Sequence, residues 1–393
     1  DRRIDTPLAV LSDRYRGLHH FFRQAFSQVT NPPIDSLRER SVMSLKTRLG
    51  NLGNILEDGP SQCDLLQLES PVITNATLSS MYKYFGDTFA EISCTFEPAN
   101  GSGALGRALE KIQSDAEEAV RGGKSHIILS DLNINKVSAP VPMILATAAV
   151  HSHLVREELR TFTSLNVRSG ECLDVHYFAV LVGVGATTVN AYLAEETIKD
   201  RNRRKLVANL SFKQSLKNYK SAIDQGLLKI MSKMGISIVS SYRGGYCFEA
   251  IGLSRALVAK YFPGMSSRLS GIGLTGIEGK VAEMHSQAFS AGIIPLSIGG
   301  IYKYRSGNER HGHDGKLIHA LQMAVSTESS KLYKRYSKGV HSRTPIHLRD
   351  LLDFQSDRSV LPVSQVQSVT EIRKRLVAPG ISLGALSPEG HET

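Results

Sequence analysis

The fold class of this sequence is indicated by residues 126–167, HIILSDLNINKVSAPVPMILATAAVHSHLVREELRTFTSLNV. It begins with a short apolar run that predicts a strand over 126–132 and ends with another over 163–167. Between them, the longer amphipathic run over 142–160 predicts a helix. Strand, helix and strand in this order are typical of a β/α unit, in which the helix connects two parallel strands.

The same alternation extends from about residue 70 to residue 290. Further strands are expected over Ala90–Phe96, Val175–Val182 and Ile236–Ser241, and further helices over 104–121, 187–199, 212–234, 246–262 and 276–290. The helix over 212–234 has the clearest pattern, because its apolar residues form one stripe while lysines occupy the other faces. We therefore predict the α/β fold class, with a barrel-like β/α central domain.

The two ends of the chain differ from this central region. HHFFRQAFSQV, residues 19–29, has apolar positions at helical spacing and predicts a helix that ends before the prolines that follow it. After Ile301 the sequence becomes polar, then helix-rich and finally extended and interrupted by prolines. We expect four parts: a helical N-terminal segment of the central domain over 1–66, the β/α central domain over 67–300, an extended C-terminal connector over 301–376, and the first strand of another domain within 377–393.

The composition excludes several classes of protein. With 393 residues, of which 41% are apolar and 21% charged, the chain is neither disordered nor collagenous. No apolar run reaches the roughly 18 residues of a membrane span, and the N-terminus lacks the apolar stretch of a secretory signal, so we expect no membrane association. Cys63, Cys94, Cys172 and Cys247 lie far apart without a CxxC pair, which favours a reducing cytoplasm over a disulfide scaffold. Because the chain opens on Asp1 without a methionine, we expect it to be a piece of a longer polypeptide.

The charge raises the question of an acidic partner. Forty-seven basic residues against 37 acidic ones give a formal net charge of +10. The excess is spread over several places, including 201–205, 213–220 and 331–338, and no RNP-like aromatic motif or zinc-finger spacing accompanies it. We interpret these residues as a solvated or protein-facing surface and expect no nucleic acid as a partner.

GSGALG is the motif that most resembles a cofactor site. Gly101, Gly103 and Gly106 follow an expected strand and open an expected helix, and Asp131 ends the next strand. In a dinucleotide fold such glycines let the backbone approach a pyrophosphate, which the helix N-terminus then binds. However, four residues separate the strand from the first glycine, where the fingerprint requires a tight turn. A free-standing nucleotide-dependent α/β oxidoreductase that uses this loop therefore stays as the alternative hypothesis.

The remaining motifs are weaker. Two further segments are rich in glycine: Gly271, Gly273 and Gly276, and Gly183 with Gly185. Two groups of histidines could suggest a metal site: His151, His153 and His176, and His311, His313 and His319 with Asp314. A helix would turn His151 and His153 about 200° apart, so they could not easily share an ion. The second histidine group lies in a polar loop. No GxSxG elbow occurs, and we predict neither a metal site nor a catalytic residue.

Several long strings resemble one known family. They include FSQVTNPPIDSLRERSVMSLKTRLGN at 26–51, HLVREELRTFTSLNVRSGE at 153–171, HYFAVLVGVGATTVNAYLAEETI at 176–198, NYKSAIDQGLLKIMSKMGISIVSSYRGGYCFEAIGL at 218–253 and ISLGALSPEGHE at 381–392. These strings are similar to the large (alpha) subunit of bacterial, NADPH-dependent glutamate synthase, and the resemblance covers nearly the whole chain. Enzymes of this family make two L-glutamate from L-glutamine and 2-oxoglutarate.

The resemblance implies a place within that subunit. The family's large subunit has an N-terminal glutaminase domain, a central domain, an FMN barrel with a 3Fe-4S cluster, and a β-helical domain, and its small (beta) subunit carries FAD and 4Fe-4S. This chain resembles the central domain, the connector and the start of the FMN-binding barrel, over 377–393. The expected role is structural: the chain connects the glutaminase and FMN sites for ammonia transfer and is inactive alone. No cofactor is expected to bind this segment by itself.

One set of site residues follows from the resemblance. In the family the end of the first barrel strand passes beside the flavin, and the matching residues here are Ser382, Leu383 and Gly384. A small residue and backbone groups at this place would let the isoalloxazine ring approach closely.

Overall fold

The computed structural model describes residues 5–27, 33–35, 37–57, 59–207, 210–290, 292, 299–355 and 357–377. The chain divides into two compact units, Asp1–His347 and Leu348–Thr393. This boundary falls within the connector expected over 301–376. The four-part division from the sequence stays a prediction.

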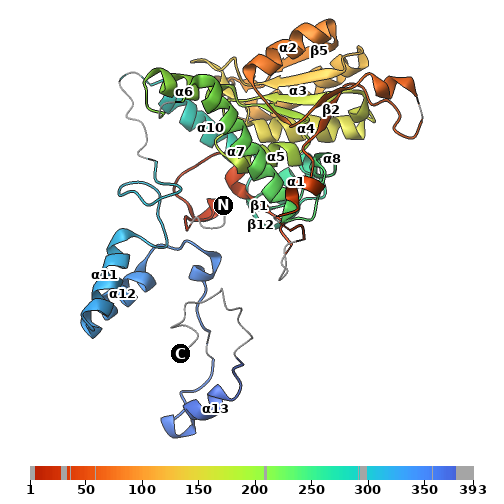
Figure 1. Cartoon of the computed structure of the whole chain (residues 1–393). Helices are drawn as coiled ribbons and strands as arrows, with labels where there is room; N and C mark the ends of the chain where they lie inside the picture. Colours follow the sequence, from red (N-terminus) through yellow and green to blue (C-terminus); the bar gives the residue numbers. More distant parts are fainter. Residues whose placement is uncertain are drawn as a thin grey trace. The chain divides into compact units, whose positions relative to one another are not determined.

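The first unit is built on a five-stranded parallel sheet (Figure 1). Its strands are β4 (Val72–Ile73), β10 (Thr188–Asn190), β9 (Ser164–Arg168), β7 (His126–Ser130) and β5 (Phe89–Ser93), in that spatial order. All four neighbouring pairs are parallel. The predicted α/β class is confirmed. Within the described residues the sheet has two edges, β4 and β5, so these strands do not close into a barrel.

Helices follow the strands and cover the sheet. They are α2 (Asn75–Phe85), α3 (Ala104–Arg121), α4 (Met143–Arg156), α5 (Val175–Gly183), α6 (Tyr192–Arg203) and α7 (Phe212–Ser232). Side chains of β7 alternate between the two faces, as a strand requires. Ile127 and Leu129 join the large core of α3, α4 and α5, whereas Ile128 joins a smaller cluster with Leu78 and Met81 of α2.

A second, smaller sheet lies in the same unit. It contains β1 (Phe22–Gln24), β11 (Phe248–Leu253) and β12 (Ser266–Ile272), with β1 antiparallel and β12 parallel to β11. The other elements of this unit are α1 (Glu39–Val42), β2 (Thr47–Leu49), β3 (Leu66–Leu68), β6 (Thr95–Phe96), β8 (Ala139–Pro140), α8 (Val239–Tyr242), α9 (Arg255–Tyr261), α10 (Leu274–Ala288), α11 (Gly315–Ser326) and α12 (Ser330–Ser342). Among the described residues, no helix combines the length and apolarity needed to cross a membrane.

Several predicted elements are confirmed. The helix expected over 104–121 is α3 with the same bounds, and those expected over 142–160, 212–234 and 276–290 are α4, α7 and α10 within a few residues. The strands expected at 90–96, 126–132 and 163–167 correspond to β5 with β6, β7 and β9. These stretches have either clear helical periodicity or short β-branched runs between turn residues.

The strand predicted over Val175–Val182 is wrong, because these residues form α5. The helix is buried on nearly every side, so its sequence is apolar apart from His176 and has no separate polar face. Its start is fixed by Asp174, whose side chain accepts a hydrogen bond from the Tyr177 backbone N–H at 2.9 Å. The strand predicted over Ile236–Ser241 is also wrong: Val239–Tyr242 is the short helix α8, and only Ile238 forms an isolated bridge, with Ser44.

In two regions that were predicted to be helical, a strand precedes the helix. A third predicted helical region, at the N-terminus, does not form a helix. The regions 187–199 and 246–262 open with β10 and β11 before α6 and α9. The helical N-terminal segment is not found in the described part of 1–66, where short 3-10 turns, short strands and the four-residue α1 occur instead. In particular, Phe22 pairs with Ala250 in the small sheet, so tertiary pairing overrides the local helical pattern.

The second unit contains little regular structure in its described residues. It has the short helix α13 (Val369–Arg373) and two 3-10 turns, Leu348–Leu351 and Val363–Gln365. Every described residue from 348 to 377 is exposed within this chain. This agrees with the extended, proline-punctuated pattern of the sequence.

Candidate functional site

The GSGALG loop forms the N-terminus of α3, as predicted, but a side chain of the protein itself fills it. The backbone N–H of Gly103 donates to Oε1 of Glu278, and the N–H of Leu105 donates to Oε2, both at 3.0 Å. Glu278 comes from α10 and is only 9% exposed. Its carboxylate takes the place that a phosphate would need at a helix N-terminus.

Asp131 is also engaged within the protein. It is fully buried and accepts hydrogen bonds from the Ser169 hydroxyl at 2.9 Å and the Gly170 N–H at 2.9 Å. Burial raises its pKa, although these hydrogen bonds oppose the shift. Asp131 therefore ties the end of β7 to the turn after β9 and does not face a ribose. Together with Glu278, this removes the structural basis of the nucleotide alternative.

The glycines of GVGATT are explained by close packing. A Cβ atom on Gly183 would lie 2.3 Å from the ring of Phe248, and one on Gly185 would lie 2.4 Å from the ring of His151. Gly185 also has φ +123°, a conformation that L side chains rarely adopt. These positions require glycine for backbone approach, with no ligand involved.

The first group of histidines singled out in the sequence does not converge. His151 accepts a hydrogen bond from Arg160 at 3.0 Å, His153 pairs with Glu117 at 2.7 Å, and His176 contacts Gln24 at 2.9 Å. Burial is the main reason that the pKa of His151 falls to about 3, and Arg160 contributes. One group in the described residues, Glu117, His153 and Glu157, could hold a cation. However, Arg121 already pairs with both of its carboxylates and would compete with a metal ion for them.

A small pocket lies beside the carboxyl ends of the main strands, the usual ligand position in open α/β sheets. It has a volume of about 300 Å³, and its mainly apolar wall includes Tyr15, Met284 and Phe289. Its carboxylate is Glu171, which accepts hydrogen bonds from the Met143 N–H at 2.9 Å and the Tyr177 hydroxyl at 2.5 Å. Burial raises the pKa of Glu171 to about 7. The sequence analysis missed this group, because nothing in the local sequence signals it.

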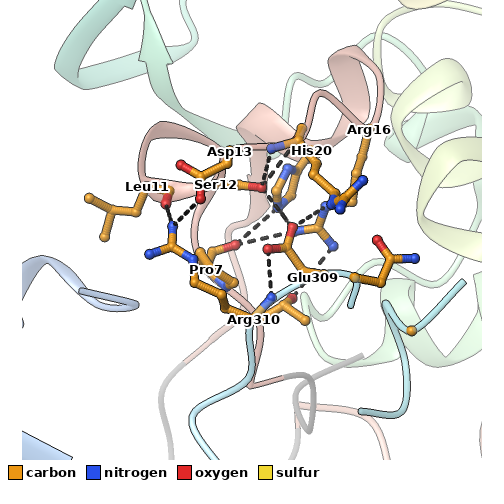
Figure 2. A network of polar contacts seen from close by, with 12 residues as sticks. Pro7, Leu11, Ser12, Asp13, Arg16, His20, Glu309 and Arg310 are labelled. Atoms are coloured by element: carbon orange, nitrogen blue, oxygen red, sulfur yellow. Dashed lines mark hydrogen bonds and ion pairs between the residues drawn. The ribbon is translucent and has the colours of Figure 1, made fainter. Parts of the chain in front are cut away.

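A network of polar contacts joins residues far apart in the chain (Figure 2). We call it the junction. It consists of Asp5, Pro7, Leu11, Ser12, Asp13, Arg16 and His20 on one side, and Glu309, Arg310, His311 and His313 on the other.

Glu309 is the central carboxylate of the junction. It is 3% exposed, accepts a hydrogen bond from the Ser12 hydroxyl at 2.6 Å and lies 3.7 Å from Nε of Arg16. Arg16 in turn donates to the Pro7 carbonyl at 3.2 Å and contacts His20 (Figure 2). Burial lowers the pKa of His20 to about 3, with Arg16 as the next cause, so its ring is neutral. Arg310 donates to the Leu11 carbonyl at 2.5 Å.

Asp5 makes the second set of contacts in the junction. Its carboxylate faces Nδ1 of His311 at 2.6 Å and accepts from the backbone N–H of His313 at 2.8 Å. Burial alone would raise the pKa of Asp5, but these hydrogen bonds outweigh it and the pKa is lowered. Two members of the second histidine group, His311 and His313, thus share a carboxylate that the sequence analysis did not select, whereas Asp314 caps α11.

The residues predicted to contact a flavin cannot be placed. Ser382, Leu383 and Gly384 lie outside the described residues. Among the residues that are described, Cys63, Cys94, Cys172 and Cys247 are free thiols, and none belongs to a group that could hold a metal. The described residues therefore do not fit an iron–sulfur cluster.

The structure is that of an α/β domain in which the buried carboxylates Asp131, Glu278 and Glu309 accept hydrogen bonds from other residues of the domain. The model of the glutamate synthase central domain matches residues 4–254, and that of a conserved region in glutamate synthase matches residues 311–393. The chain belongs to the glutamate synthase family.

Relatives agree with this assignment. The chain is 60% identical to the glutamate synthase [NADPH] large chain of Azospirillum brasilense over 389 residues, which are 99% of this chain and 26% of that protein. It is 38% identical to the corresponding chain of Bacillus subtilis, covering 99% and 25%, and 38% identical to ferredoxin-dependent glutamate synthase 2 of Synechocystis, covering 99% and 26%. The chain thus spans about a quarter of the length of these curated relatives, and corresponds to a central region of glutamate synthase.

Among solved structures, inosine 5'-monophosphate dehydrogenase of Legionella pneumophila is 11% identical, with a TM-score of 0.34. The match covers 61% of this chain and 99% of that one. This similarity is too low to support a conclusion about fold.

Proposed function

We propose that this chain is a structural spacer within an NADPH-dependent glutamate synthase, an oxidoreductase that forms two L-glutamate from L-glutamine and 2-oxoglutarate. The junction is the observation that carries the proposal. It joins residues 5–20, which precede the β/α region, to residues 309–313, which follow it. Such a clamp would fix the positions at which the polypeptide enters and leaves the domain. Ammonia could then pass between two active sites held at a constant separation.

The proposal places the reaction centres in neighbouring parts of the protein. A glutaminase domain would precede this region, and an FMN domain with a 3Fe-4S cluster would follow it, beginning within 377–393. Ser382, Leu383 and Gly384 would lie beside the flavin, and a small (beta) subunit with FAD and 4Fe-4S would supply electrons. NADPH as donor is supported by the name of the relative at 60% identity, since the ferredoxin-dependent relatives are less similar. The free cysteines support a location in the cytoplasm.

Inactivity of the segment alone is supported by its internal contacts. Two residues of the predicted cofactor motif already have hydrogen-bond partners within the protein. The Gly103 N–H donates to Glu278, and Asp131 accepts from Ser169 and Gly170.

Titrating NAD, NADP and FMN into the purified chain, while following fluorescence, tests this expectation. Hydrogen exchange should first show that α3 and α4 are protected, which establishes that the chain is folded. We expect no micromolar binding and no oxidation of NADPH. Dinucleotide binding by the folded chain would instead support the free-standing oxidoreductase.

A further inference from the structure

A large pocket lies between residues 6–26, the start of α5 and the carboxyl half of α7. Its volume is about 930 Å³, and its wall combines apolar side chains such as Phe22, Ile230 and Ile301 with charged ones. Small-molecule sites typically have volumes of about 300–1,000 Å³. The pocket could therefore hold an organic molecule much larger than a single inorganic ion.

Positive charge predominates in this pocket. Arg16, Arg23, Lys229 and Lys233 line it, and Asp174 is the carboxylate among the lining residues. Asp174 is already engaged, because it accepts hydrogen bonds from the Tyr177 N–H and the Tyr302 hydroxyl. Two of these cations are balanced from outside the pocket, because Lys229 pairs with Glu39 at 2.6 Å and Arg16 lies 3.7 Å from Glu309.

Arg23 is the cation with the least support from the protein. Among the described residues, no hydrogen bond or ion pair involves its guanidinium group. Burial is the main cause of the lowered pKa values of Arg16 and His20, and the charge of Arg23 lowers both further. The charges of Arg16 and Arg23 therefore repel each other, and a bound anion would relieve this repulsion.

His19 provides an independent indication of a ligand. Its side chain lines the pocket and the residue is only 8% exposed. Its Nδ1 is buried and has no hydrogen-bond partner among the described residues. Buried polar atoms without a partner in the protein are rare, and a bound water, ion or ligand can satisfy them.

We propose that this pocket binds a small organic carboxylate, with the carboxylate group on Arg23 and the hydrocarbon stem against the apolar wall. Guanidinium groups recognise carboxylates through paired hydrogen bonds. The apolar wall favours an organic anion over phosphate. The site goes beyond the spacer role, which requires no ligand at this position.

Hydrogen exchange of the full-length protein that carries this chain tests the proposal. The probe is glutarate, a five-carbon dicarboxylate without the keto or amino group of the expected substrates. We expect glutarate to slow exchange in peptides that cover residues 16–24 and 226–233. Phosphate at the same ionic strength should not.

Variants make the test specific. Arg23→Gln should weaken the glutarate-dependent protection about tenfold, as expected for loss of one charge-assisted interaction. Arg23→Lys should retain part of it. Lys217→Gln is the matched control, because Lys217 is an exposed residue of the same α7 that does not line the pocket. Unchanged exchange in α3 and α4 would show that each variant is folded.

Three results would overturn the proposal. They are a lack of protection by glutarate, equal protection by phosphate, and protection that Arg23→Gln leaves unchanged. Protection restricted to peptides outside this pocket has the same meaning, since glutarate would then bind only elsewhere in the protein.

Discussion

The helices around the main sheet and the junction are held together by different physical means. Around α4 and α5, apolar side chains and glycine backbones are in direct contact, as at Gly185 and His151. In the junction, charged and polar groups such as Glu309 and Arg16 form the contacts. Packing should therefore determine whether the domain folds, whereas the junction should determine where residues 299–313 are attached.

The largest expected effect is at Gly185. In Gly185→Ala the new methyl group would overlap the His151 ring in a backbone conformation unfavourable for alanine. We expect a loss of about 3 kcal/mol or more in the free energy of unfolding, measured by denaturant titration. Gly123→Ala is the control, because Gly123 also has a positive φ but no atom lies within 4 Å of its Cβ position. Equal losses in the two variants would contradict the importance of packing here.

The next effect is expected at Glu309. Glu309→Ala would leave Arg16 buried without its carboxylate and remove the bond from Ser12, at a cost of about 2–4 kcal/mol. Hydrogen exchange should accelerate in residues 299–313, while α3 and α4 stay protected. Glu110→Ala, at an exposed ion pair of α3, should change neither. Simultaneous loss of protection in both regions would show that the junction and the sheet are not separate.

The third prediction concerns Glu171 and the pH dependence of the free energy of unfolding. Its pKa in the folded protein is about 7, above the ordinary value of 4.5, so its contribution to stability is present below pH 4.5 and is lost as the pH rises through 7. Glu171→Gln cannot ionise and should be more stable than the original protein by about 3 kcal/mol at pH 8. At pH 4.5 the two should be nearly equal. Urea titration measures the free energy of unfolding of both proteins. If their difference were the same at pH 4.5 and pH 8, ionisation of Glu171 would not be its cause.

Glu278 should have the smallest effect. Glu278→Ala removes the acceptor for the N–H groups of Gly103 and Leu105, which should cost about 1–2 kcal/mol. Glu283→Ala, at an exposed position of the same helix, is the control. Thermal unfolding measures both. If the Glu278 variant gained affinity for a dinucleotide, the loop would be a masked cofactor site, which the account does not expect.

The helices α3 and α5 show which elements could be predicted from the sequence. The helix α3 was predicted with its bounds, because Ala104–Arg121 alternates apolar and polar residues at helical spacing. The helix α5 was predicted as a strand, because its residues are buried on nearly all sides and carry no periodic signal. The buried strand β7 was nevertheless predicted, because its short β-branched run lies between turn residues, so burial misleads only where the apolar run has the length of either element.

The candidate site was less accessible to sequence analysis. Ser12 and Glu309 are 297 positions apart, and no local motif connects them. His311 and His313 were noticed as a group, but their common partner is Asp5, near the other end of the first unit. The GSGALG loop was recognised correctly as a strand-to-helix turn, whereas the carboxylate that fills it comes from α10 and could not be foreseen.

The central claim is that the junction keeps two reaction centres in a fixed relation. It is tested most directly by the ratio of glutamate formed to glutamine hydrolysed in the full-length protein, measured together with free ammonia. In Glu309→Ala we expect glutamine hydrolysis to continue while the ratio falls and ammonia escapes; Glu110→Ala should keep the original ratio. An unchanged ratio in the Glu309 variant, once hydrogen exchange has shown the junction to be open, would contradict the account.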